Sequence, residues 1–130
     1  MPKIFISYRR KDSQHITDRI HDHMVQHFDA ESVFQDVDAI PFGVDFRDYL
    51  HDQIAKSDVV LVIIGPDWAK IMAERAGQEN DFVRVEVENA LKQGKLVIPV
   101  LVKGANMPTP DAVPKTISKL CYLNAPRVRP

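Results

Sequence analysis

Residues 58–64 read Asp-Val-Val-Leu-Val-Ile-Ile, and residues 95–102 read Lys-Leu-Val-Ile-Pro-Val-Leu-Val. Both stretches are apolar at consecutive positions and rich in β-branched side chains, which is typical of parallel strands with helices on both faces. Shorter apolar runs over residues 4–7 and 32–35, and a weaker one over 120–123, bring the number of expected strands to five. The pattern therefore indicates an α/β domain built on a parallel sheet.

Amphipathic segments separate these strands. The first carries an apolar stripe at helical spacing, formed by Ile16, Ile20, Met24 and Phe28. Asp12 or Ser13 is expected to cap the start of this helix. Two further helices are predicted over residues 46–55 and 81–92. Because strands and helices alternate, and crossovers between parallel strands are right-handed, helices should cover both faces of the sheet.

The totals exclude several classes of protein. A length of 130 residues fits one domain, and a net charge of −1 does not favour binding to nucleic acid or to anionic membranes. The single Cys121 excludes a multi-cysteine zinc site, and no apolar run is long enough to span a membrane. We expect a cytoplasmic domain over residues 1–130, truncated before the C-terminal helix that ordinarily covers the last strand.

Ligands of open parallel sheets bind outside the carboxyl ends of the strands. Arg9 and Arg10 follow the first strand, and two guanidinium groups there suit a phosphate or pyrophosphate; a solvated pair of charges is the alternative. Trp68 follows the third strand, where its ring would either line the cleft or pack in the core. The sequence thus predicts an anion site at this edge.

The helix over residues 81–92 carries one further candidate. Its core stripe is formed by Val83, Val87, Ala90 and Leu91. Glu86 lies on one flank of the stripe, one turn after Phe82, while Glu88 lies on the opposite flank, one turn after Arg84. A partly desolvated carboxyl group beside an aromatic ring is a catalytic candidate, whereas Glu88 is explained by a surface pair with Arg84.

Several familiar sites are absent from the sequence. There is no GxxxxGK[ST] phosphate-binding loop and no GxGxxG dinucleotide fingerprint, so neither motif predicts nucleotide binding. A phosphoacceptor receiver domain needs carboxylates after the first strand, but residues 8–10 read Tyr-Arg-Arg. His23 and His27 have helical spacing but no third ligand, so no metal site is predicted.

Four segments together resemble a Toll/interleukin receptor (TIR) domain of bacterial type. They are residues 4–10 (IFISYRR), 34–43, 57–68 and 81–87 (DFVRVEV). The resemblance implies a flavodoxin-like fold whose five parallel strands have the order 2-1-3-4-5. The family contains interaction scaffolds and also enzymes that cleave NAD at the nicotinamide–ribose bond, and both alternatives remain open here.

In the enzymatic members a helical glutamate is catalytic, and this position falls on Glu86. The residues that the resemblance places at the substrate are Tyr8, Arg9, Arg10, Trp68 and Phe82, with Phe82 replacing a frequent Trp. The loop residues that it implies in self-association with other TIR domains are Asp36, Pro41, Phe42 and Gly43. The leading prediction is an NAD+ glycohydrolase, or an ADP-ribosyl cyclase, in bacterial immune defence. It would use NAD as substrate and need no cofactor.

Overall fold

The computed structural model describes residues 2–35 and 40–128. The strands in this part of the chain are β1 (Ile4–Ser7), β2 (Val33–Phe34), β3 (Val59–Ile64) and β4 (Leu96–Leu101). They form one sheet in the order β2-β1-β3-β4, and every pairing is parallel. The prediction of a parallel, flavodoxin-like α/β fold is confirmed, with its first four strands in the expected order.

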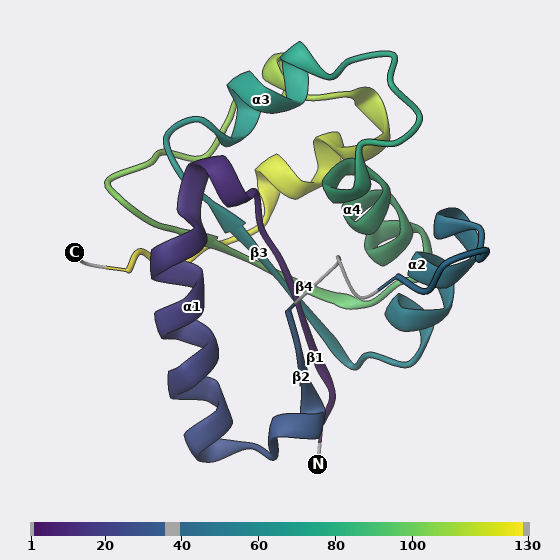
Figure 1. Ribbon diagram of the computed structural model, residues 1–130. Coiled ribbons are helices and arrows are strands. Elements are labelled where there is room, and N and C mark those ends of the chain that lie inside the picture. The colour runs from purple at the N-terminus through teal and green to yellow at the C-terminus, as the bar shows by residue number, and fades with distance from the viewer. Residues whose placement is uncertain (1, 36–39, 129–130) are drawn as a thin grey trace.

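Helices cover both faces of this sheet, as the alternating pattern predicts (Figure 1). The α-helices are α1 (Arg10–His27), α2 (Phe46–Ala55), α3 (Trp68–Glu74) and α4 (Phe82–Lys92). Short 3-10 helices are η1 (Ala30–Ser32), η3 (Pro110–Ala112) and η4 (Lys115–Tyr122). Helix α1 packs on one face, and α2, α3, α4 and η4 pack on the other. None of the described helices has the length and apolar character needed to cross a membrane.

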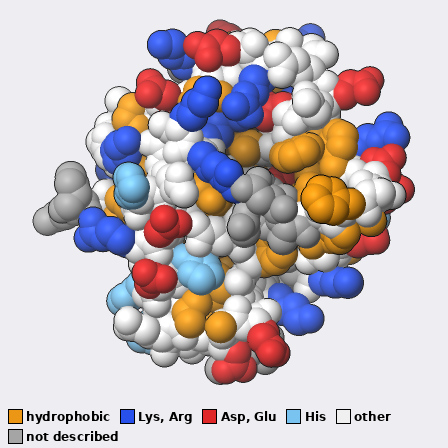
Figure 2. All heavy atoms as spheres, in the orientation of Figure 1, with side chains coloured by type: hydrophobic (Ala, Val, Ile, Leu, Met, Phe, Trp, Pro, Cys, Tyr) orange, Lys and Arg blue, Asp and Glu red, His pale blue; other side chains and the backbone are white. Residues whose placement is uncertain are grey.

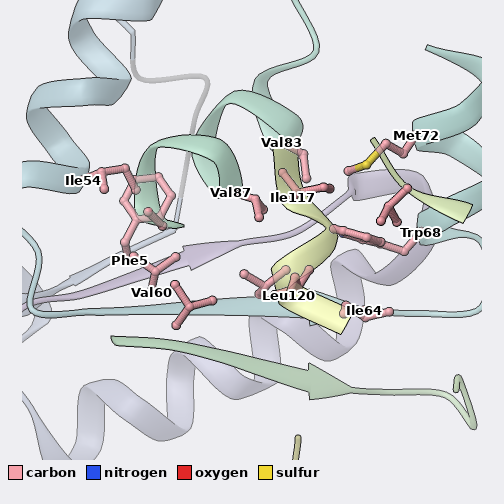
Figure 3. Packing of buried hydrophobic residues seen from close by; sticks show 14 of the residues in the cluster. Phe5, Ile54, Val60, Ile64, Trp68, Met72, Val83, Val87, Ile117 and Leu120 are labelled. Atoms are coloured by element: carbon pink, nitrogen blue, oxygen red, sulfur yellow. The ribbon is translucent and has the colours of Figure 1, made fainter. Parts of the chain in front are cut away.

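The larger core cluster lies between the sheet and α2, α3, α4 and η4 (Figure 3). Phe5 and Val60 point from the sheet towards Val83 and Val87 of α4. A smaller cluster on the opposite face joins the sheet to the apolar stripe of α1. Both clusters use neighbouring residues of β1 and β3, because successive side chains of a strand point to opposite faces.

The fifth strand is where the structure departs from the sequence prediction. Residues 120–123 were expected to form it, but they belong largely to η4 and the turn that follows. Ile117 and Leu120 are both fully buried, and their spacing of three residues places them on one face of a 3-10 helix. The chain then returns to the sheet edge, where Arg127 makes a single parallel bridge with Leu101. Within the described residues the sheet therefore has four strands.

Candidate functional site

The site lies at the carboxyl ends of β1 and β3, where the sequence places it. A pocket of about 390 Å3 opens between the start of α1, the end of α3 and the start of α4. Its lining includes Tyr8, Arg9, Arg10, Lys11, Arg75 and Phe82. Figure 2 shows Lys and Arg side chains gathered over the start of α1, beside a hydrophobic area towards α4. Several cations thus gather beside this pocket on a chain whose net charge is −1.

Arg9 is paired within the protein. Its Nη1 donates to Asp81 Oδ1 at 3.0 Å and its Nη2 donates to Asp81 Oδ2 at 2.8 Å, so the guanidinium group is bidentate. The side chains of Arg9 and Asp81 are only 2% and 1% exposed. Asp81 directly precedes α4, so the pair fastens the start of that helix to the end of β1. Sequence inspection missed this contact, because 72 positions separate the two residues.

Glu86 is more deeply buried than its position on the helix predicts, since only partial desolvation was expected. Its side chain is completely buried, and neither carboxyl oxygen has a hydrogen-bond partner of normal geometry among the described residues. Burial raises the pKa of Glu86 to about 8, while the nearby Ser7 hydroxyl and Arg9 guanidinium offset part of this rise. The carboxyl group is therefore mostly protonated at neutral pH in this conformation. A chemical role as an anion requires that it become exposed.

Trp68 does not line the pocket, where the resemblance places it, and its ring takes the alternative position in the core. It begins α3, and its buried partners Ile71 and Met72 follow at helical spacing, which turns the ring towards the sheet (Figure 3). The ring is fully buried in the larger core cluster. Arg9 Cζ lies over this ring, 6.0 Å from its centroid, so Trp68 makes a cation–π contact with the paired guanidinium group.

Asp12 has a different task from the helix cap that we expected. Ser13 interrupts the helical conformation of α1 with φ −151°, and the Asp12 carboxylate accepts from Gly65 N and Asp67 N, both at 2.8 Å. Burial raises the pKa of Asp12, while these two backbone donors oppose the rise. A Cβ on Gly65 would lie 2.5 Å from Asp12 Oδ2. Asp12 thus ties the start of α1 to the loop that leads into Trp68.

The loop before α2 is strongly exposed in its described part. Pro41, Phe42 and Gly43 all face solvent, and the Phe42 ring is fully exposed. Gly43 has φ +79°, a conformation that favours glycine. Asp36, which we expected in the same interaction loop, lies outside the described residues.

The start of α2 reaches the candidate site. The ring centroids of Phe46, the first residue of α2, and Phe82 are 4.8 Å apart. Phe82 is half-buried and lines the pocket, so the exposed loop is connected to the pocket through one aromatic contact. A change in the position of the loop can therefore affect the pocket.

The structure brings Tyr8, Arg9, Arg10 and Phe82 to one pocket. Glu86 does not line it, but lies one turn after Phe82 and near Arg9 of the lining. Glu88 pairs with Arg84 (Nε to Oε1, 3.8 Å) on the other flank of α4, as the spacing predicts. A larger hollow of about 630 Å3 lies on the Glu88 side, between α4 and η4. It is lined mainly by Lys and other polar side chains and by none of the described candidate site residues, so the smaller pocket is the better candidate.

Comparison with known proteins agrees with this fold. The family model for the TIR domain matches residues 4–126, nearly the whole chain. The chain belongs to the TIR domain family. The fold of this TIR domain is similar to that of the TIR domains in the activated Roq1 resistosome that directly recognizes the pathogen effector XopQ. The TM-score is 0.61 at 15% identity, over 94% of this chain and 69% of that one. The resemblance seen in the sequence is thus confirmed at the level of family and fold.

Proposed function

We propose that this TIR domain is an NAD+ glycohydrolase that cleaves the bond between nicotinamide and ribose. The observation that carries the proposal is the buried carboxyl group of Glu86 near Arg9, which belongs to a pocket lined by cationic and aromatic side chains. A dinucleotide offers matching chemistry, because it combines an anionic pyrophosphate with flat rings. The same observation favours NAD over other ligands of flavodoxin-like folds.

The reaction suits a site with one carboxylate. Nicotinamide leaves as a neutral base from a cationic ring, so no general acid is required. The ribose carbon becomes oxocarbenium-like, and a carboxylate near it stabilises the developing positive charge. Water then adds to that carbon and loses a proton, which gives ADP-ribose, nicotinamide and H+; attack by a group of the same molecule would give a cyclic product instead.

Catalysis requires a conformational opening, because Glu86 is inaccessible and mostly protonated in the closed domain. Opening would hydrate the carboxyl group, lower its pKa and let it ionise beside the ribose. Phe82 lies one turn before Glu86 and contacts Phe46, which follows the exposed loop before α2, so self-association through that loop is the proposed trigger. Arg10, at the pocket surface, would hold the pyrophosphate, and Tyr8 and Phe82 would contact a ring. The proposed setting is bacterial immune defence in the cytoplasm.

Incubation with NAD tests the proposal. Nicotinamide release should be measured over a wide range of protein concentration, because a domain that opens on assembly will be inactive when dilute. Turnover that rises more steeply than protein concentration is the expected result. A folded and assembled sample that releases no nicotinamide would refute the enzymatic function.

A non-catalytic scaffold is the second candidate function. It is favoured by the complete exposure of Phe42, since a large apolar ring in water is a common feature of contact surfaces. In that case Pro41→Ala or Phe42→Ser would abolish self-association, while no condition would produce nicotinamide from NAD.

A further inference from the structure

We propose that Arg75 and Lys11 join Arg10 in binding the phosphate groups of the substrate, and that Arg9 instead remains paired with Asp81. This inference rests on the proposed function and makes it more specific. It identifies two cations that the sequence patterns do not indicate. It also separates two roles, substrate binding and support of the site, among the basic residues of one pocket.

Arg9 is unsuited to phosphate binding in this structure. Both of its terminal nitrogens already donate to Asp81, at 3.0 and 2.8 Å. Its side chain is 2% exposed and lies over the buried ring of Trp68. To bind a phosphate it would have to leave Asp81 as an unpaired carboxylate, 1% exposed, in the protein interior, which is strongly unfavourable. Arg9 therefore serves to position α4 and Glu86.

Arg75 has the opposite properties. It follows α3 directly, lines the same pocket, and its side chain is 41% exposed. Its Nη1 lies 3.9 Å from Asp81 Oδ1, too far for a hydrogen bond, so this contact orients the guanidinium group without using its donors. A planar guanidinium group at the mouth of a pocket matches two phosphate oxygens at once. Asp81 thus holds Arg9 tightly and Arg75 loosely.

Lys11 extends the positive charge along the other wall of the pocket. It lies in the first turn of α1 and is exposed, whereas Arg75 comes from the end of α3. None of the described residues that line the pocket is acidic. A pyrophosphate between Arg75 and Lys11 would therefore meet cations from two elements, with Arg10 of α1 beside Lys11. No carboxylate among the described lining residues would repel it.

The test compares wild type with Arg75→Gln and with Lys70→Gln. Lys70 is an exposed cation of α3, the helix that Arg75 follows, and it does not line the pocket, so it controls for the loss of one positive charge. Arg75→Gln should raise KM for NAD about tenfold with little change in kcat, as expected for one lost charge-assisted contact. Lys70→Gln should leave both constants unchanged. Arg75→Lys should restore KM for NAD part of the way to the wild-type value. Raising the salt concentration should raise KM more for wild type than for Arg75→Gln.

Inhibitors locate the contact and separate this inference from the proposed function. The dissociation constants of ADP and of adenosine are measured by calorimetry and, if NAD is cleaved, also as inhibition constants. Arg75→Gln should raise the dissociation constant of ADP about tenfold and leave that of adenosine unchanged, because only ADP carries phosphates. If wild type binds ADP in this way but never releases nicotinamide, the proposed function fails and the inference stands. The inference would be overturned if Arg75→Gln and Lys70→Gln changed KM for NAD or ADP binding equally. It would also be overturned if Arg75→Gln weakened the binding of ADP and of adenosine equally, or if wild type did not bind ADP.

Discussion

Replacing Glu86 by Gln should stabilise the domain increasingly as the pH rises. Glutamine keeps the size and shape of a protonated glutamate but cannot ionise. Burial raises the pKa of Glu86 from its ordinary value of 4.5 to about 8 in the folded protein. Between these values the folded chain holds a proton that the unfolded chain has lost. The contribution of Glu86 to stability is therefore complete below about pH 4.5 and is lost as the pH rises to about 8.

The size of the effect follows from this proton difference. Where one more proton is bound in the folded state, the free energy of unfolding falls by about 1.4 kcal/mol per pH unit. Unfolded glutamate is only partly protonated near pH 5, so the wild type should lose about 2.5 kcal/mol relative to Glu86→Gln between about pH 5 and pH 7. Asp12 also has a raised pKa, but it is present in both proteins and cancels in the comparison.

Urea unfolding at several pH values measures this difference. Trp68 is the single Trp of the chain and is fully buried, so its fluorescence should report the transition in both proteins. The two proteins should have similar stability at low pH and diverge steadily above it. A constant difference between wild type and Glu86→Gln from about pH 5 to pH 7 would refute the reasoning, because it would mean that the Glu86 pKa is ordinary.

Three further changes probe separate parts of the structure by urea unfolding. Gly65→Ala should lower the free energy of unfolding by about 1–3 kcal/mol, because its Cβ would lie 2.5 Å from the Asp12 carboxylate. An unchanged urea midpoint would contradict this close approach. Arg9→Gln should cost about 3–5 kcal/mol by leaving the buried Asp81 unpaired, and a loss below about 1 kcal/mol would indicate an exposed pair. Phe42→Ser should change stability by less than about 0.5 kcal/mol while weakening self-association in sedimentation experiments; a large loss of stability would place the ring in a core.

The elements with strong apolar patterns could be predicted from the sequence. Strands β3 and β4 and helices α2 and α4 agree with the predicted segments to within one or two residues. Residues 120–123 could not be placed, because a short apolar run fits a strand or a buried turn of helix equally well. Helix α3 carries a signal that was overlooked: Trp68, Ile71 and Met72 have helical spacing and are all buried.

The candidate site could be predicted in outline but not in its contacts. The position of Glu86 one turn after Phe82 follows from helical spacing, and the pocket lies at the expected edge. The pairing of Arg9 with Asp81 leaves no trace in local sequence, because it depends on how two distant elements meet. The full burial of Glu86 depends likewise on the packing of its neighbours, which the pattern along one helix does not contain.

Nicotinamide release by matched variants tests the central claim most directly. Wild type, Glu86→Ala and Glu88→Ala should be compared at the same high protein concentration, with folding checked by circular dichroism. Loss of one electrostatic contact in a transition state lowers turnover by a factor of about 100–1000, and Glu86→Ala should lose at least this much. Glu88→Ala should remain close to wild type, since Glu88 lies on the other flank of α4. If folded Glu86→Ala released nicotinamide as fast as wild type, Glu86 would not be the catalytic residue.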